Sequence, residues 1–190
     1  MAFKSSVWLS GLCLVAWSVA TPVSKAAWQE PPKKPAAQEK EEAEPPANKD
    51  LEQKACGPKD EKHSAKTDKN QHPKPEPPAD KALVYVIRPT MMGNKVQTKL
   101  AVDQKWVGVN RGDNYFFLLL APGEHYFCSQ AENHSVLALK MEAGKTYYLQ
   151  QKIRMGFMKA GNKLVQLDEA EGKAGLAKTH LSIFEEKGKD

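Results

Sequence analysis

The hydrophobic pattern from residue 82 onward predicts a series of short β-strands. Residues 82–87 are apolar at every position and carry β-branched or aromatic side chains on both alternating faces, which is typical of a strand covered on both sides. Pro89 ends this run. Further strands are predicted at residues 98–102, 106–109, 115–120, 125–130, 136–142, 147–153 and 163–167.

Turns separate these runs at short intervals. The glycines that mark them are Gly93, Gly112, Gly123, Gly144 and Gly161. Short strands interrupted this often indicate an antiparallel sandwich or a partly closed barrel. One run, residues 168–183, has the pattern of a helix, with acidic residues at its start. We therefore predict a mainly β fold, an antiparallel β-sandwich with a short C-terminal helix.

The chain before this domain has a different composition. Residues 28–80 hold 10 of the 13 prolines and 22 charged side chains, and their large apolar residues are Trp28 and Leu51. Such a stretch cannot bury enough surface to offset the entropy lost on ordering. We predict a disordered linker at 27–79, a β-sandwich domain at 80–184 and a disordered tail at 185–190.

The first 26 residues are predicted to be an export signal. Lys4 precedes an apolar run at residues 7–20, and small residues allow cleavage after Ala20 or after Ala26, with Ala26 preferred. The run is too short for a membrane-spanning helix, although an uncleaved anchor stays open as an alternative. A lipoprotein signal at Cys13 is disfavoured because Leu12 stands where a small residue is needed.

Export leaves Cys56 and Cys128 as an even pair in an oxidising compartment, which predicts a disulfide between them. Such a bond would pin residues 56–79 to the domain. The alternative is two free thiols in a chain that stays in the cytoplasm.

The net charge of +5 does not point to nucleic acid. The residues that would remain after cleavage at Ala26 carry about +3, dispersed along the chain, which is too little for an electrostatic nucleic-acid footprint. No nucleic-acid partner, and no transmembrane segment after cleavage, is predicted.

The histidines do not predict an active site or a metal site. His125 and His134 have serines and an acid nearby in sequence, but neighbours along a strand alternate faces, and no nucleophile elbow is present. Cys56, His63 and His72 match no structural zinc spacing. We predict no catalytic residues, no metal and no cofactor, hence a protein that is not an enzyme.

One predicted hairpin tip forms a candidate contact surface, because basic residues flank apolar ones there. Its residues are Lys152, Arg154, Met155, Phe157, Met158 and Lys159. Such a tip could touch an anionic lipid, a cell-wall polymer or a protein groove. The alternative is a twisted hairpin whose methionines pack on the edge of the sandwich.

Several motifs together resemble a bacterial family known as domain of unknown function 2846. They are residues 81–89 (KALVYVIRP), 101–108 (AVDQKWVG), 115–116 (YF), 121–125 (APGEH) and 142–148 (EAGKTYY). The upstream motifs at 56–58, 66–69 and 71–73 resemble an extension that some exported members carry. The family usually has glycine where Gln104 stands, so a different turn type is expected there.

This resemblance implies an immunoglobulin-like or PEGA-like β-sandwich in the cell envelope, without an established activity. We predict an exported, periplasmic or extracellular, non-enzymatic module with a structural or interaction role, whose partner is an envelope protein or polymer. The alternative is a carbohydrate- or small-ligand-binding domain in which Trp106, Tyr115 or Tyr147 stacks on a sugar.

Overall fold

The structure, a computed structural model, describes residues 49–59, 61–89, 93–155 and 160–186. Helices α1 (Lys49–Ala55) and α2 (Glu169–Leu176) lie within these ranges. The strands are β1 (His63–Asp68), β2 (Ala82–Arg88), β3 (Thr98–Val102), β4 (Lys105–Asn110), β5 (Asn114–Leu120), β6 (Gly123–Gln130), β7 (His134–Met141), β8 (Thr146–Met155), β9 (Ala160–Leu167) and β10 (His180–Glu186).

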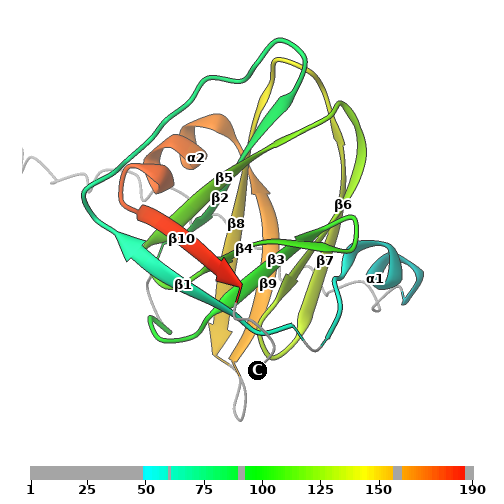
Figure 1. The fold of residues 1–190 in the computed structure, drawn as a ribbon, viewed down its shortest axis with the longest axis vertical. Helices are drawn as coiled ribbons and strands as arrows, with labels where there is room; N and C mark the ends of the chain where they lie inside the picture. Colours follow the sequence, from blue (N-terminus) through cyan, green and yellow to red (C-terminus); the bar gives the residue numbers. More distant parts are fainter. Residues whose placement is uncertain (1–48, 60, 90–92, 156–159, 187–190) are drawn as a thin grey trace, which may run out of the picture. The chain divides into compact units, whose positions relative to one another are not determined.

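The strands form two facing sheets, which confirms the predicted mainly β, sandwich-like fold (Figure 1). Sheet A has the order β1-β10-β5-β2-β8-β9, and sheet B has the order β4-β3-β6-β7. Two pairs in sheet A, β2 with β8 and β10 with β5, are parallel. Sheet A is therefore mixed rather than antiparallel throughout. The chain leaves β2, builds β5 and the whole of sheet B, and only then returns as β8, a connection long enough for a parallel pair.

Strand β2 is the centre of the molecule. All seven of its residues are buried, as the run of apolar side chains predicted. Val84 and Val86 point into the core between the sheets, with Phe116, Phe127 and Leu149 among the residues around them. The alternate residues of β2 point to the other face of sheet A, because side chains alternate along a strand.

That other face of sheet A is covered by α2 and by a proline-rich segment, residues 73–78. The Tyr85 hydroxyl donates a hydrogen bond to the Pro75 carbonyl at 3.0 Å, and the Tyr115 hydroxyl donates to the Pro73 carbonyl at 3.0 Å. Gly172 of α2 lies so close to Tyr148 that a Cβ at this position would stand 2.2 Å from the ring's Cγ. Buried tyrosines therefore hold a segment whose composition alone predicts disorder.

The predicted helix at 168–183 is wrong beyond Leu176. Asp168 caps α2 by accepting a hydrogen bond from the Glu171 backbone at 2.8 Å, and Thr179 closes the other end by donating to the Leu176 carbonyl at 3.0 Å. The chain then continues as β10, which extends two residues into the predicted tail. Leu181 and Ile183 alternate with polar residues at the spacing of a strand.

Order also begins earlier than the predicted linker boundary of residue 79. Helix α1 and strand β1 lie inside that range, and all six residues of β1 pair antiparallel with β10. The predicted signal at 1–26 and the first part of the linker lie outside the described residues. The hairpin of β3 and β4 turns at Asp103 and Gln104, whose φ angles of 48° and 68° are both positive, as in a type I′ turn.

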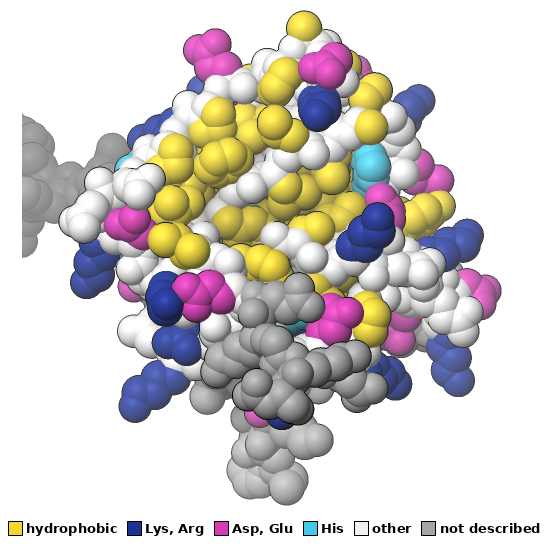
Figure 2. Space-filling view, viewed as in Figure 1, with side chains coloured by type: hydrophobic (Ala, Val, Ile, Leu, Met, Phe, Trp, Pro, Cys, Tyr) yellow, Lys and Arg dark blue, Asp and Glu magenta, His cyan; other side chains and the backbone are white. Residues whose placement is uncertain are grey.

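An apolar band crosses the face seen in Figure 2, over the region where Figure 1 shows β5 and β10. Strand β10 pairs with β5 only at Asn114 and Tyr115, so the later residues of β5 lack a strand on that side among the described residues. Leu119 and Ile183 are 43% and 41% exposed. This is where the sandwich is least completely covered.

Candidate functional site

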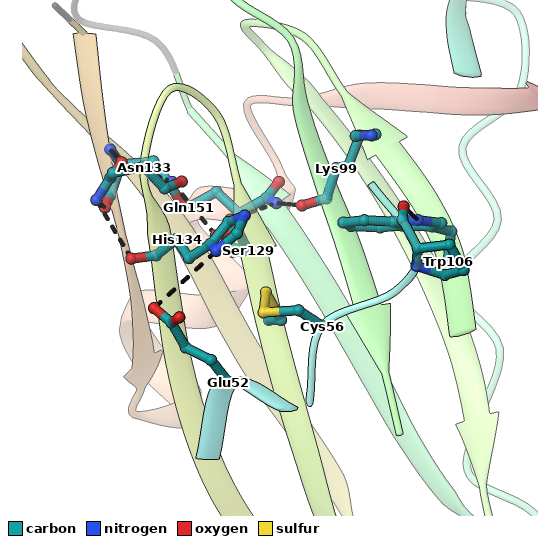
Figure 3. The surroundings of a disulfide bond; sticks show 11 residues. Glu52, Cys56, Lys99, Trp106, Ser129, Asn133, His134 and Gln151 are labelled. Carbon is teal, nitrogen blue, oxygen red and sulfur yellow. Dashed lines mark hydrogen bonds and ion pairs between the residues drawn. A yellow bond between two sulfur atoms is a disulfide. The ribbon is translucent and has the colours of Figure 1, made fainter. Parts of the chain in front are cut away.

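A covalent link fixes the N-terminal segment onto the outer face of sheet B. Cys56, directly after α1, forms a disulfide with Cys128 of β6 (Figure 3). Ala55, Ala101 and Cys128 are fully buried and form a small apolar cluster around the link. From Cys56 the chain crosses sheet B to reach β1; residues 57–59 and 61–62 are called the crossing segment below.

Trp106 of β4 is the main contact of the crossing segment. Its indole Nε1 donates a hydrogen bond to the Pro58 carbonyl at 2.9 Å. Gly57 lies flat against the ring, and a Cβ there would come within 2.6 Å of the indole nitrogen. Only glycine fits at this position, so the disulfide and Trp106 together determine the path of the segment.

A pocket of about 470 Å³ opens between the crossing segment and sheet B, and we call it the basic pocket. Lys59, Lys62 and His63 line it from one side. Gln97 and Lys99, two residues apart and therefore on one face of the chain, line it from the other side. Gln130 of β6 and Glu61 also line the pocket.

Lys99 is the most constrained cation of the basic pocket. Its ammonium group lies 4.4 Å from the centroid of the Trp106 ring and donates to the Glu61 carbonyl oxygen at 3.2 Å. Burial lowers the pKa of Lys99, and the charge of Glu61 acts in the opposite direction. A cation held over an aromatic face in this way has little freedom to move to another partner.

The lysines of the basic pocket have no ion pair within 4.0 Å in the described part of the chain. Lys66, Lys145 and Lys173 each pair with a carboxylate, whereas Lys59, Lys62 and Lys99 do not. The carboxylate of Glu61 lies 3.5 Å from the imidazole of His63. The described residues that line the pocket thus include three lysines and one carboxylate, that of Glu61.

Two amide side chains add polar groups to the basic pocket. The Oε1 atom of Gln130 is buried and has no hydrogen-bond partner among the described residues. Gln97, oriented to satisfy its neighbours, accepts hydrogen bonds from Arg111 at 2.7 and 3.0 Å through its amide oxygen. A buried amide atom without a partner costs free energy unless a ligand or water supplies one.

A buried polar network beneath the pocket fixes the strands that carry it (Figure 3). The Gln151 oxygen accepts from Thr98 at 2.9 Å and from Asn110 at 3.1 Å, and its amide nitrogen donates to Ser129 at 3.0 Å. Thr98 lies between Gln97 and Lys99 in sequence, and Ser129 precedes Gln130. The inward side chains of β3 and β6 are thus locked, which orients the outward ones.

A second pocket, of about 440 Å³, lies on the opposite side of the sandwich between the proline-rich segment and α2. Tyr85 and Tyr148 form its floor, with ring centroids 5.5 Å apart and an interplanar angle of 10°. Lys74 and Glu169 are among the charged residues at its rim. Burial raises the pKa of Tyr148, as expected for a phenol in an apolar site.

The predicted contact surface is only partly visible. Lys152 and Arg154 are exposed on β8. The backbone of Met155 ends that strand, and Phe157, Met158 and Lys159 lie outside the described residues. The prediction that these residues form one surface stays a prediction.

The histidines considered for catalysis have other partners. His125 Nδ1 lies 2.6 Å from an Asp103 carboxylate oxygen, and its Nε2 lies 2.8 Å from the Ala121 carbonyl. His134 lies 4.0 Å from Glu52 of α1. The Ser135 hydroxyl accepts a hydrogen bond from the Leu164 backbone, at 2.9 Å. These contacts join elements of the fold.

The aromatic rings considered for sugar stacking are also engaged. Tyr115 is fully buried under the proline-rich segment, and Trp106 is covered by Gly57 and Lys99. The Tyr147 hydroxyl accepts a hydrogen bond from the Glu142 backbone at 3.0 Å. These three rings do not form an exposed stacking platform.

Neither a metal site nor a membrane span is visible in the part of the chain that the structure describes. Within 49–59, 61–89, 93–155 and 160–186, no three acidic, histidine or cysteine side chains cluster as metal ligands would. Over the same residues, no helix combines the length and the apolar character that crossing a bilayer requires.

Comparison with known proteins finds a family that part of the sandwich is similar to. Residues 78–163 match the model of the family described as "Protein of unknown function (DUF2846)". The chain is therefore similar to that family over these residues. The resemblance predicted from the sequence is thereby confirmed. The matched residues run from just before β2 into β9, so they contain sheet B and the centre of sheet A.

The chain is also similar to a protein from Haemophilus influenzae described as "Uncharacterized protein". The two are 30% identical over 101 residues, which cover 53% of this chain and 60% of the relative. The chain thus spans well under two thirds of that relative's length. The relative suggests a bacterial origin and supplies no activity.

The basic pocket combines family residues with residues outside the family match. Gln97, Lys99 and Gln130 lie within 78–163, whereas Lys59 and Lys62 lie before it. Sequence reasoning missed this pocket because 38 residues separate Glu61 from Lys99 and nothing in their spacing shows that they meet. The one available signal was the predicted disulfide, which brings this segment to β6.

Proposed function

We propose that this protein is an exported, non-enzymatic interaction module of the bacterial cell envelope. The observation that carries the proposal is the Cys56–Cys128 disulfide, which ties the N-terminal segment to the sandwich. Disulfides persist in the periplasm and outside the cell and are rare in the cytosol. The apolar run at residues 7–20 supplies the matching export signal.

An interaction role fits the surface better than catalysis does. The hydroxyls of Ser129 and Ser135 accept hydrogen bonds within the sandwich, and among the described residues no hydrogen bond joins either hydroxyl to His125 or His134. The basic pocket instead offers fixed positive charge and amide groups to a ligand. Sugar binding by stacking is not favoured, because Tyr115 is buried and Gly57 and Lys99 cover Trp106.

Fractionation and mass measurement test this proposal. Cells that express the full chain would be separated into cytoplasmic and envelope fractions after free thiols have been blocked by alkylation. We expect the protein in an envelope fraction, shortened by a signal of 20 or 26 residues. Its intact mass should fall two hydrogens short of the reduced form, with Cys56 and Cys128 unlabelled.

Cytoplasmic protein of full length with both cysteines alkylated would contradict the proposal. A Cys128→Ser variant is the matched control, since it must show alkylation of Cys56 if the assay reports on this bond. A lipid adduct on the intact protein would change the mode of attachment and leave the envelope location supported.

A further inference from the structure

We infer that the basic pocket is a binding site for an anionic group, a phosphate or carboxylate carried by a small molecule or by the end of a polymer. The inference deepens the proposed interaction role, since it names the chemistry that the module would recognise. It depends on the pocket's own geometry and not on the compartment in which the protein resides.

The first argument is a cation held in a fixed place. Lys99 is partly withdrawn from water, lies over the Trp106 ring and, among the described residues, has one protein hydrogen bond, to the Glu61 carbonyl. An ammonium group has three N–H donors, so two remain for a ligand. No carboxylate lies within 4.0 Å of it among the described residues, so the nearby charge of Glu61 acts on it without a direct ion pair.

The second argument is convergence from two independent parts of the chain. Lys59 and Lys62 come from the crossing segment, and Lys99 comes from β3. The disulfide and the hydrogen bond between Trp106 and Pro58 set the path of the backbone that carries Lys59 and Lys62, whose side chains are exposed. Three ammonium groups around a cavity of about 470 Å³ can surround one anion of a few non-hydrogen atoms.

The third argument is the unpartnered amide of Gln130. Its buried Oε1 needs a donor, and an amide oxygen accepts hydrogen bonds from hydroxyl or N–H groups. A ligand could reach this oxygen only after the Gln130 side chain turns toward the pocket, so the amide adds a polar group there without selecting one kind of anion.

The test is an NMR titration of the full chain, purified without reductant, at constant ionic strength and neutral pH. Inorganic pyrophosphate and citrate are the two probes, one for phosphate and one for carboxylate recognition. We expect saturable shifts of the backbone amides of 61–63, 97–99 and 130–131, with a Kd on the order of 1 mM for such small probes. The probe that binds more tightly identifies the class of anion.

Variants of single lysines test whether the anion binds in the basic pocket. Lys99→Gln should weaken the tighter probe about tenfold, and Lys99→Arg should keep most of the affinity because the charge and the stacking remain. Lys66→Gln is the matched control: Lys66 lies nearby on β1 but is exposed and paired with Glu185 at 2.7 Å. Its removal should leave the Kd unchanged.

If Lys99→Gln does not fold, as judged by near-ultraviolet circular dichroism, the exposed pair Lys59→Gln and Lys62→Gln replaces it, and the double variant should weaken binding by a similar factor. Shifts that do not saturate with either probe would overturn the inference. A loss with Lys66→Gln equal to that of the pocket variants would also overturn it, because the attraction would then be general. These outcomes are independent of where the protein resides in the cell.

Discussion

The two outer faces of the sandwich are covered in different ways. On sheet A, α2 and the proline-rich segment pack on a tyrosine-rich face, and their contacts are apolar packing and hydrogen bonds from buried hydroxyls. On sheet B, α1 is only seven residues long, and a disulfide holds the chain beside it. One face is held by noncovalent contacts alone, whereas the other adds a covalent bond to its apolar cluster and hydrogen bonds.

This difference explains why the pockets on the two faces differ. The segments that cover sheet A pack on tyrosine rings, so the pocket there has an aromatic floor. The covalent link on sheet B lets a segment with very few apolar residues cross the sheet, so charged groups can stay at the surface beside a rigid wall. A short, polar segment can therefore form a binding wall without a core of its own.

Removing the disulfide should give the largest loss of stability. The bond closes a loop with a sequence separation of 72, and the double variant Cys56→Ser, Cys128→Ser should lose about 4 kcal/mol of unfolding free energy in the chain-entropy estimate. Guanidinium unfolding of the oxidised protein and the variant measures this.

Hydrogen exchange then shows where the loss falls. Amides of the crossing segment should lose protection in the variant, whereas those of β2 and β8 should keep it relative to global unfolding. Equal unfolding free energies for the two proteins would mean that the face of sheet B is held without the bond.

Gly172→Ala should loosen the opposite face. The new methyl group would collide with the stem of Tyr148, and after the gain in helix propensity a net loss of about 2 kcal/mol is expected. Gly175→Ala is the control in the same helix, since its Cβ would meet Ile87 at an ordinary 3.6 Å. The control should be neutral or gain about 0.5 kcal/mol in the same unfolding assay. Similar losses in both variants would argue against a specific contact with Tyr148.

Tyr115→Phe should cost about 1.5 kcal/mol, because the carbonyl of Pro73 loses its buried donor. Tyr147→Phe should cost less stability, because the Tyr147 hydroxyl is exposed. A cost for Tyr115→Phe no larger than that for Tyr147→Phe would show that the proline-rich segment does not depend on this bond.

The same tyrosine should make stability depend on pH in the alkaline range. Burial, assisted by Tyr85, raises the pKa of Tyr115 to about 12. A raised folded-state pKa means that the unfolded chain gives up its proton first, so this contribution is complete below pH 10 and disappears as pH rises to about 12. Between pH 9 and pH 12, the unfolding free energy should fall less steeply with pH for Tyr115→Phe than for the wild type. An unchanged slope would contradict the assignment.

The smallest expected effect is at the start of α2. Asp168→Ala removes the cap that accepts from the Glu171 backbone and should cost about 1 kcal/mol. Asp168→Asn keeps an acceptor and should cost less. If both variants match the wild type, α2 is held on sheet A by Leu176 and Gly172 alone.

The strands of the sandwich core could be predicted because their side chains are apolar in the pattern that a buried strand requires. Strand β2 is apolar at every position and is covered on both faces, as expected. Strand β1 could not be found in this way, since His63–Asp68 holds a single buried apolar residue, Ala65. Strand β1 is held by backbone pairing with β10. Such pairing leaves no pattern of side chains from which it could be predicted.

The candidate site was less predictable than the fold. The disulfide followed from counting cysteines, but the lysines beside it looked like those of any solvated, charged segment. Their role depends on a neighbour, Trp106, whose ring was interpreted as part of a sheet or a sugar platform. Charge that gathers through tertiary contacts leaves no local signature in the sequence.

The pairing of β1 with β10 also has a consequence for how the protein can be divided. Strand β1 lies before the matched segment in sequence and β10 lies after it, and the two strands pair with each other at six positions. A fragment trimmed to residues 78–163 would lose this pairing, and it would also lose α2 and most of the proline-rich segment, which cover Tyr85, Tyr115 and Tyr148. Bare tyrosine faces invite aggregation, so the boundaries of the family are not the boundaries of a stable unit.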